Sequence, residues 1–184
     1  EFDHSKFDNI EEYDSLDELI KDLQSRKLDA IVLNEGQANK TQYLTDDLSR
    51  IEPILDVFPH SFGFQKDNTK LVESFNDHLK SVENKGEIIK RWKTISYGQN
   101  KIEELKKSLT GENGSINALF RLKNEPFAYK DEEGYMTGME IYSLYNFAKA
   151  NGYAVNLKEA NTYDELIESL KNKEADVVGG LLPI

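Results

Sequence analysis

The sequence has 184 residues, a length that fits one ordinary domain or two small lobes and allows a buried core. Hydrophobic residues make up 38% and charged residues 31%, which is too apolar for an intrinsically disordered chain. The net charge of −11, with scattered lysines, argues against a nucleic-acid partner, and the lack of cysteine excludes disulfides and thiol chemistry. No apolar run reaches the roughly 18 residues that a membrane span requires.

The first predicted elements are a helix and a strand. Apolar residues recur at helical spacing and predict a helix over about 15–26: Leu16, Leu19, Ile20 and Leu23. The short run Ala30–Leu33 is apolar and rich in β-branched residues, which predicts a strand buried on both faces, as in a parallel sheet. A short helix near 37–43 and an edge strand at 50–58 are expected to follow.

The next stretch predicts an aromatic strand and two helices. The strand is "SFGFQK", residues 61–66. Apolar residues at three- and four-residue steps then predict a helix: Leu71, Val72, Phe75, Leu79 and Val82. A further helix over about 85–93 carries Trp92, and we expect the two helices to pack together.

Residues 96–112 are predicted to be a linker that contains a small charged helix and a glycine-rich stop. The rest of the chain alternates strands with helices, which predicts an α/β fold with a parallel sheet and right-handed crossovers. Its predicted elements are a strand at 116–122, a loop with an aromatic hairpin at 123–138, a helix ended by Asn151-Gly152, a strand at 153–160, a helix opening at Tyr163 and a strand at 175–178.

Two parts of the chain repeat one phrase, "LQSRKLDAIVLNEG" at 23–36 and "LKNKEADVVGGLLPI" at 170–184. The segment around the second copy, "PFAYKDEEGYMTGMEIYSLYNFAKANGY" followed by "YDELIESLKNKEADVVGGLLPI", resembles the opening half of the extracellular solute-binding proteins of the amino-acid type. These are two-lobed Venus-flytrap modules of ABC importers. Residues 12–93, with "YDSLDELIKDLQSRKLDAIVLNEG" and then "FGFQKDNTKLVESFNDHLKSVENKGEIIKRW", resemble the closing half of the same family.

The resemblance implies α/β, parallel-sheet lobes of the periplasmic binding protein type II kind, incomplete or rearranged because the two halves occur in reversed order. A piece of a tandem array explains that order. Residues 1–58 are then part of the second lobe of a first module, 59–95 its closing strand and C-terminal helices, 96–112 the linker, and 113–184 the opening part of the first lobe of a second module. A circular permutation of a single module is the alternative.

In this family the closing strand and helices fold back onto the opening lobe. The resemblance therefore implies that residues 61–66 and the helices up to Trp92 dock on the sheet formed by 113–184. Docking within one chain and docking swapped between two chains of a homodimer both fit the sequence. Contacts of Phe75 or Trp92 with that sheet are the expected sign.

The resemblance also places a ligand site. The family grips an amino acid with a carboxylate for the ammonium group, an arginine and backbone N–H groups for the carboxylate, and an aromatic platform. Asn34 stands where the family's ammonium-binding aspartate falls, with Glu35 beside it. The alternative for Asn34 is that it only ends a strand and starts a turn.

The other candidate site residues come from the C-terminal part. Asn124 stands where the aromatic platform is common, and Phe127 is a nearby ring, with hairpin packing as its alternative role. Gly180, together with Leu181, can offer backbone N–H donors to an anion or form an ordinary bend. Pro183 stands where the family usually has a hydroxyl residue. These departures disfavour an ordinary amino acid and leave another solute, or none, as the alternatives.

The function implied by the resemblance is an extracytoplasmic solute-binding domain of an ABC importer for amino acids or similar small polar solutes, with a membrane permease as partner and an extracellular, cell-surface or periplasmic location. The alternative is an extracellular tandem flytrap sensor domain of a signalling receptor. We expect no enzyme, metal or cofactor, because His4, His60 and His78 have no partner at metal-ligand spacing and no nucleophile motif is present.

Overall fold

The computed structural model describes residues 9–34, 37–38, 41, 47–49, 51, 61–83 and 99–181, with only the backbone at 83, 99–101 and 181. The chain divides into two compact units, unit 1 from Glu1 to Phe58 and unit 2 from Pro59 to Ile184. The predicted strand at 50–58 and the predicted helix at 85–93 fall outside the described residues, Ile51 excepted. Each unit is taken by itself below.

The centre of unit 2 is a four-stranded sheet in the order β1-β7-β2-β6. Its strands are β1 (Ser61–Phe64), β2 (Ser115–Arg121), β6 (Ala154–Ala160) and β7 (Val177–Leu181). The central strand β2 pairs in parallel with both β6 and β7, whereas β1 pairs antiparallel with β7. The predicted α/β fold with parallel strands is therefore confirmed.

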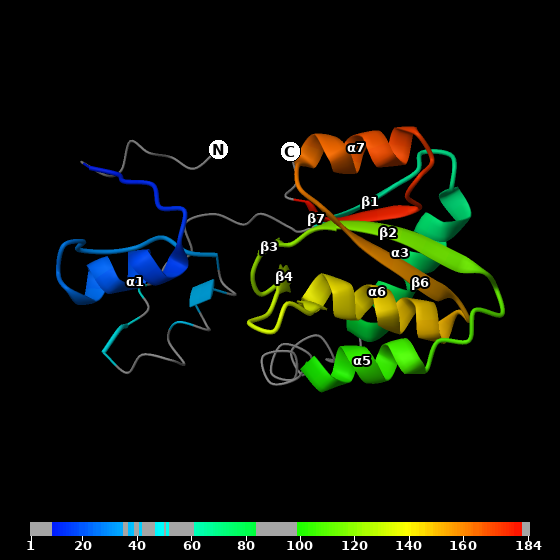
Figure 1. The fold of residues 1–184 in the computed structure, drawn as a ribbon, viewed down its shortest axis with the longest axis horizontal. Coiled ribbons are helices and arrows are strands. Elements are labelled where there is room, and N and C mark those ends of the chain that lie inside the picture. The colour runs from blue at the N-terminus through cyan, green and yellow to red at the C-terminus, as the bar shows by residue number, and fades with distance from the viewer. Residues whose placement is uncertain are drawn as a thin grey trace. The chain divides into compact units, whose positions relative to one another are not determined.

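Helices cover both faces of this sheet (Figure 1). Helix α7 (Tyr163–Lys171) lies on one side, and α5 (Gln99–Lys107) and α6 (Met139–Ala150) lie on the other. The alternation along β2 explains the two layers, because Phe120 belongs to the larger core cluster with α6 and Leu119 packs against the smaller cluster with α7. The two apolar clusters are thus the two sides of one sheet.

A small antiparallel sheet, in the order β3-β4-β5, follows β2. It consists of β3 (Lys123–Asn124), β4 (Ala128–Lys130) and β5 (Met136–Thr137). The carboxylate of Asp131 shapes the turn between β4 and β5, because its Oδ1 accepts the backbone N–H of Glu133 at 3.1 Å and of Tyr135 at 2.7 Å. This sheet is the hairpin predicted for the loop after the first strand.

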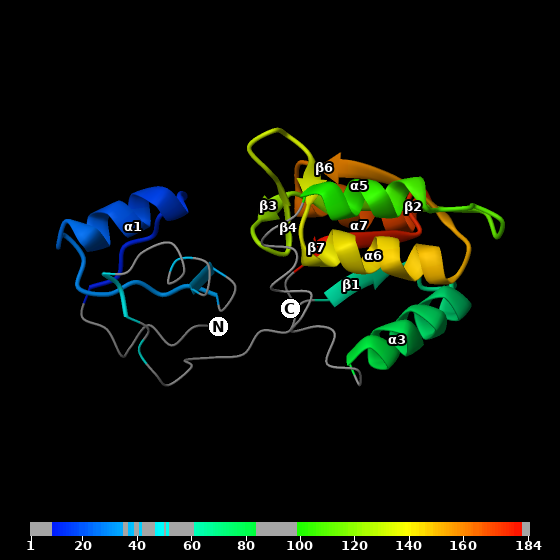
Figure 2. The same ribbon diagram turned by 90° about the horizontal axis from the view of Figure 1, so that it is seen from below.

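The predicted docking of the aromatic strand and its helix on the sheet is confirmed within one chain. Helix α3 (Thr69–Glu83) buries Phe75 to 1% exposure, in the same core cluster as Phe120 and Phe147. Phe62 of β1 completes an aromatic chain, with its ring 4.7 Å from Phe75 and 6.1 Å from Phe120. Figure 2 shows α3 beside α6. Trp92, the other expected contact, lies outside the described residues.

Residues 99–109, inside the predicted linker, are packed rather than extended. Ile102 of α5 is 3% exposed in the core cluster, with Leu105 and Leu109 packed against it. Helix α5 also contacts α6. The sequence analysis predicted this helix but not its burial, because charged residues fill its other face. A module boundary at 96–112 stays a prediction.

Unit 1 contains helix α1 (Leu16–Gln24), which matches the prediction apart from its earlier end. The side chain of Ser15 caps its first turn by accepting the N–H of Glu18 at 3.4 Å. Beyond its last turn Arg26 has a φ of 61°, a left-handed conformation that cannot continue a helix. Helix α7 repeats this design, because Thr162 is its cap and Lys173 has the same φ of 61°. The repeated phrase therefore contains the same helix end and left-handed turn twice.

The strand predicted at Ala30–Leu33 is wrong. The described backbone there forms no strand, and Val32 is 55% exposed. In the second copy the corresponding strand is held by β2, where the N–H of Asp176 donates to the C=O of Asn117 at 2.8 Å. The described part of unit 1 contains no such neighbour, and a parallel strand without one has no partners for its backbone groups.

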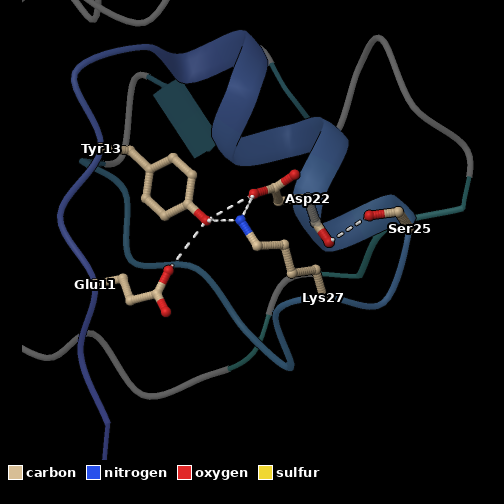
Figure 3. Close-up of polar contacts among 5 residues, drawn as sticks. All are labelled: Glu11, Tyr13, Asp22, Ser25 and Lys27. Atoms are coloured by element: carbon tan, nitrogen blue, oxygen red, sulfur yellow. Dashed lines mark hydrogen bonds and ion pairs between the residues drawn. The ribbon is translucent and has the colours of Figure 1, made fainter.

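A polar cluster closes the end of α1 (Figure 3). The phenol of Tyr13 donates to Asp22 Oδ2 at 2.7 Å, and Lys27 Nζ lies 2.5 Å from the same oxygen. The hydrogen bond from Lys27 holds the pKa of Asp22 below its ordinary value, and the bond to Asp22 raises the pKa of Tyr13. Lys27 is exposed and Tyr13 and Asp22 are half-buried, so this cluster fixes the local chain path rather than adding much stability.

Candidate functional site

The carboxyl ends of the three parallel strands meet at one edge of the unit 2 sheet. Arg121 ends β2, Ala160 ends β6 and Leu181 ends β7. In open α/β sheets, ligands bind in the crevice outside these carboxyl ends. We therefore take this edge, called the strand-end edge below, as the candidate site.

Backbone contacts fix the chain between β2 and α6 at this edge. The N–H of Met139 donates to the C=O of Pro126 at 3.0 Å, and the N–H of Glu140 donates to the C=O of Phe127 at 2.9 Å. Gly138 has a φ of 121°, and a Cβ at that position would lie 2.3 Å from the oxygen of Phe127. The hairpin is thus held directly against the first turn of α6.

A buried carboxylate ties α6 to the end of β7. Glu140 is 5% exposed, and its Oε2 accepts the backbone N–H of Gly180 at 2.6 Å. A charge-assisted bond of this kind is short and strong in a buried setting. The N–H of Gly180 is therefore committed to the protein's own carboxylate, at the position where the sequence predicts a donor for an anion.

Different contacts require glycine at the two positions 179 and 180 of β7. A Cβ on Gly179 would lie 2.1 Å from Cε1 of Phe120, so the ring of Phe120 packs directly on that backbone. Gly180 has a φ of 74°, and a Cβ there would lie 2.5 Å from the oxygen of Arg121. Close packing of β7 on β2 requires both glycines.

Arg121 forms a stacked pair with the first residue of α7. Its guanidinium carbon lies 4.6 Å from the ring centroid of Tyr163, and its Nη1 donates to the Tyr163 hydroxyl at 3.3 Å. Arg121 as a whole is half-buried, its hydrogen bond to Tyr163 is exposed, and Tyr163 is 39% exposed. A cation and an aromatic ring therefore stand together at the strand-end edge.

Four of the predicted site residues belong to this edge. Asn124 is half-buried in β3, and its C=O accepts the N–H of Phe127 at 2.8 Å. Phe127 is half-buried, and Glu140 links it to Gly180: the N–H of Glu140 donates to the C=O of Phe127, and its carboxylate accepts the N–H of Gly180. Leu181, described by its backbone alone, pairs with Ser61 of β1. Their roles toward a ligand stay predictions.

The remaining predicted site residues are placed less fully. Asn34 of unit 1 starts a helical turn, because its Oδ1 accepts the N–H of Gln37 and its C=O accepts the N–H of Ala38, both at 2.9 Å. The turn that the structural alternative gave for Asn34 is therefore present, although no strand precedes it, and the ligand role of Asn34 stays a prediction. Glu35 and Pro183 lie outside the described residues.

Sequence reasoning missed Arg121, Glu140 and Tyr163. A charged residue within the apolar strand "INALFRL" was the available signal for Arg121. Glu140 looks like an ordinary acidic residue in the first turn of a helix, and Tyr163 looks like a helix start. Only the pairing of distant segments shows that each has a partner at this edge.

A groove of about 590 Å³ lies elsewhere on unit 2, between α3 and the C-terminal end of α6. Its lining includes Lys70, Asp77, His78 and Asn151. Charges of both signs surround it, and it lies at the opposite end of α6 from Glu140. We therefore do not assign the candidate site to this groove.

Comparison with known proteins supports the resemblance for the segment that forms the edge. Residues 116–183 match the family model of the bacterial extracellular solute-binding proteins, family 3. This confirms, over that segment, the family that the sequence resembles. The family description is one of solute binding rather than catalysis, in agreement with the expectation that the protein is not an enzyme.

A solved structure is also similar to part of the chain. It is the crystal structure of the L-cystine solute receptor of Neisseria gonorrhoeae in the unliganded open conformation, with 26% sequence identity and a TM-score of 0.35. The similarity covers 45% of this chain and 32% of that chain. Among curated proteins, no sequence matches this chain. Within the described ranges, no helix is long and apolar enough to cross a membrane.

Proposed function

We propose that unit 2 is a solute-binding lobe and that a small polar solute, such as an amino acid, binds at its strand-end edge. The main support is that the family match and the strand-end edge come from the same segment of the chain. The segment that matches the solute-binding family, residues 116–183, is the segment that supplies all three parallel strand ends. It also supplies Asn124, Phe127 and Arg121 at that edge.

The wider role we propose is that of an extracytoplasmic solute-binding domain of an ABC importer, with a membrane permease as its partner. In such a protein, two lobes close on the solute and present it to the permease. Unit 1 is proposed to belong to the second lobe of a preceding module, and Asn34 and Glu35 to its ligand-facing end. The repeated helix of α1 and α7 supports this assignment, since a lobe of the same design in both units would carry such a helix.

Binding to a single lobe is expected to be weak, because only part of the solute surface is covered. A ligand that binds only the folded state stabilises it by RT ln(1 + [L]/Kd), so the unfolding midpoint rises with the ligand concentration. Thermal unfolding of the chain in the presence of each L-amino acid and of L-cystine, at millimolar concentrations, therefore tests the proposal. At least one solute should raise the midpoint, with the increase becoming logarithmic in the solute concentration above its Kd.

Paired variants locate the binding site. Asn124→Ala removes a half-buried side chain at the strand-end edge, whereas Asn76→Ala removes an exposed one on α3. The proposal expects weaker binding in the first variant and unchanged binding in the second. Unchanged midpoints with every solute, or an equal loss of binding in both variants, would contradict it.

A further inference from the structure

We propose that the solute bound at the strand-end edge carries a negative charge, a small carboxylate such as an acidic amino acid, and that Arg121 is the residue that binds it. This inference rests on the proposed function and names the substrate class for the same site. Arg121 ends the central strand β2, so its side chain starts at the middle of the edge. A carboxylate is the group that a guanidinium recognises best.

The charge of Arg121 is not balanced within the described part of the protein. Its interactions there are the stack on Tyr163 and the hydrogen bond to the Tyr163 hydroxyl, which is neutral. A guanidinium has five N–H donors, so most remain open to a ligand. In a chain with 34 acidic and 23 basic side chains, a half-buried arginine without a carboxylate partner is unexpected.

Three carboxylates of the elements around this edge have partners of their own. Glu159 pairs with Lys130, and Glu165 accepts the backbone N–H of Asn161 at 2.8 Å. Glu140 accepts the N–H of Gly180. These three acidic groups therefore have partners other than the guanidinium, which stays open to a bound anion.

The bond between Glu140 and Gly180 also decides where an anion can bind. The sequence offered the backbone of β7 as an anion-binding site, but that N–H faces the protein's own carboxylate at 2.6 Å. A second negative charge at that point would be repelled. The stack on Tyr163 instead holds the planar guanidinium in one orientation, so less side-chain freedom is lost when a carboxylate binds.

The test is a titration of the 184-residue chain followed by the backbone NMR signals of Arg121, Tyr163 and Gly180, which detects binding even at millimolar affinity. The probes are L-glutamate, its neutral isostere L-glutamine, and L-lysine. We expect L-glutamate to bind at least about tenfold more tightly than the other two. Arg121→Gln should remove this preference, and Arg121→Lys should keep part of it because a point charge remains.

Lys171→Gln is the matched control, since it removes one exposed positive charge at the other end of α7. It should leave the preference unchanged. If L-glutamine or L-lysine binds as tightly as L-glutamate or more tightly, the proposal of a negatively charged solute is wrong, but solute binding at this edge still holds. If none of the three probes moves these signals, the inference is wrong, whereas the strand-end site itself stands or falls with the solute panel and the Asn124→Ala variant.

Discussion

The ring of Phe75 in α3 lies 4.9 Å from the ring of Phe147 in α6, although the two residues come from segments on either side of α5. Both rings are almost fully buried, at 1% and 0% exposure. Through this contact the segment that resembles the end of one module completes the core of the segment that resembles the start of the next. Unit 2 therefore depends on both parts of the sequence.

Replacement of Phe75 by alanine should destabilise unit 2 as a whole. Removing a buried phenylalanine from a packed core costs about 3–5 kcal/mol, through lost contacts and the cavity left behind. The free energy of unfolding measured in urea should fall by that amount. Asn76→Ala, on the exposed side of the same helix, should change it by less than about 0.5 kcal/mol. A similar, small loss in both variants would show that α3 is not part of this core.

The bond between Glu140 and Gly180 should determine how well the end of β7 is held. Glu140→Ala leaves the buried N–H of Gly180 without this acceptor, which costs about 1–3 kcal/mol. Glu140→Gln keeps an acceptor oxygen of the same reach and should cost less. Amide hydrogen exchange at Gly180 measures the effect locally. Exchange should be slowest in the parent, faster in Glu140→Gln and fastest in Glu140→Ala. Unchanged exchange in Glu140→Ala would contradict the assigned role.

The contact between Gly179 and Phe120 predicts a coupled pair of substitutions. Gly179→Ala should destabilise the protein by about 1–3 kcal/mol, because the new Cβ overlaps the ring of Phe120. Phe120→Leu leaves a cavity in the parent chain but makes room for that Cβ. The double variant should therefore be more stable than the sum of the single effects predicts, by at least about 0.5 kcal/mol. Additive effects would show that the ring moves aside without cost.

Periodicity predicted most helices and strands of unit 2 because their apolar residues face a core that the same chain supplies. The stripe of α6, with Ile141, Leu144 and Ala148 fully buried, is an example. The same reasoning failed at Ala30–Leu33, since an apolar run becomes a strand only where another strand pairs with it. Helix ends were also misplaced, because the left-handed φ of Arg26 is not visible in a pattern of apolar residues.

The candidate site was only partly accessible from the sequence. Asn124 and Phe127 became candidates through the family resemblance alone, and Gly180 through the freedom of its backbone; the structure places all three beside the ends of strands. The contact of Arg121 with Tyr163 joins residues 42 positions apart, and that of Glu140 with Gly180 joins residues 40 apart. Such pairs depend on register between strands and helices, which a single sequence does not specify.

Tyr145 should ionise late in an alkaline titration. It is 2% exposed, and burial, with a smaller contribution from Glu103, raises its pKa to about 12. Burial likewise raises the pKa of Tyr129 to about 12, so both phenols should contribute to the late phase of a spectrophotometric titration. Tyr145→Phe should reduce that phase, whereas Tyr135→Phe, which removes the hydroxyl of a residue that is 52% exposed, should leave it unchanged. Because the folded pKa lies above the ordinary value of 10.0, Tyr145 should lower the parent's stability as the pH rises from about 10 to 12. The stability of Tyr145→Phe relative to the parent should then increase over that range, and a constant difference would show that the phenol is not held away from water.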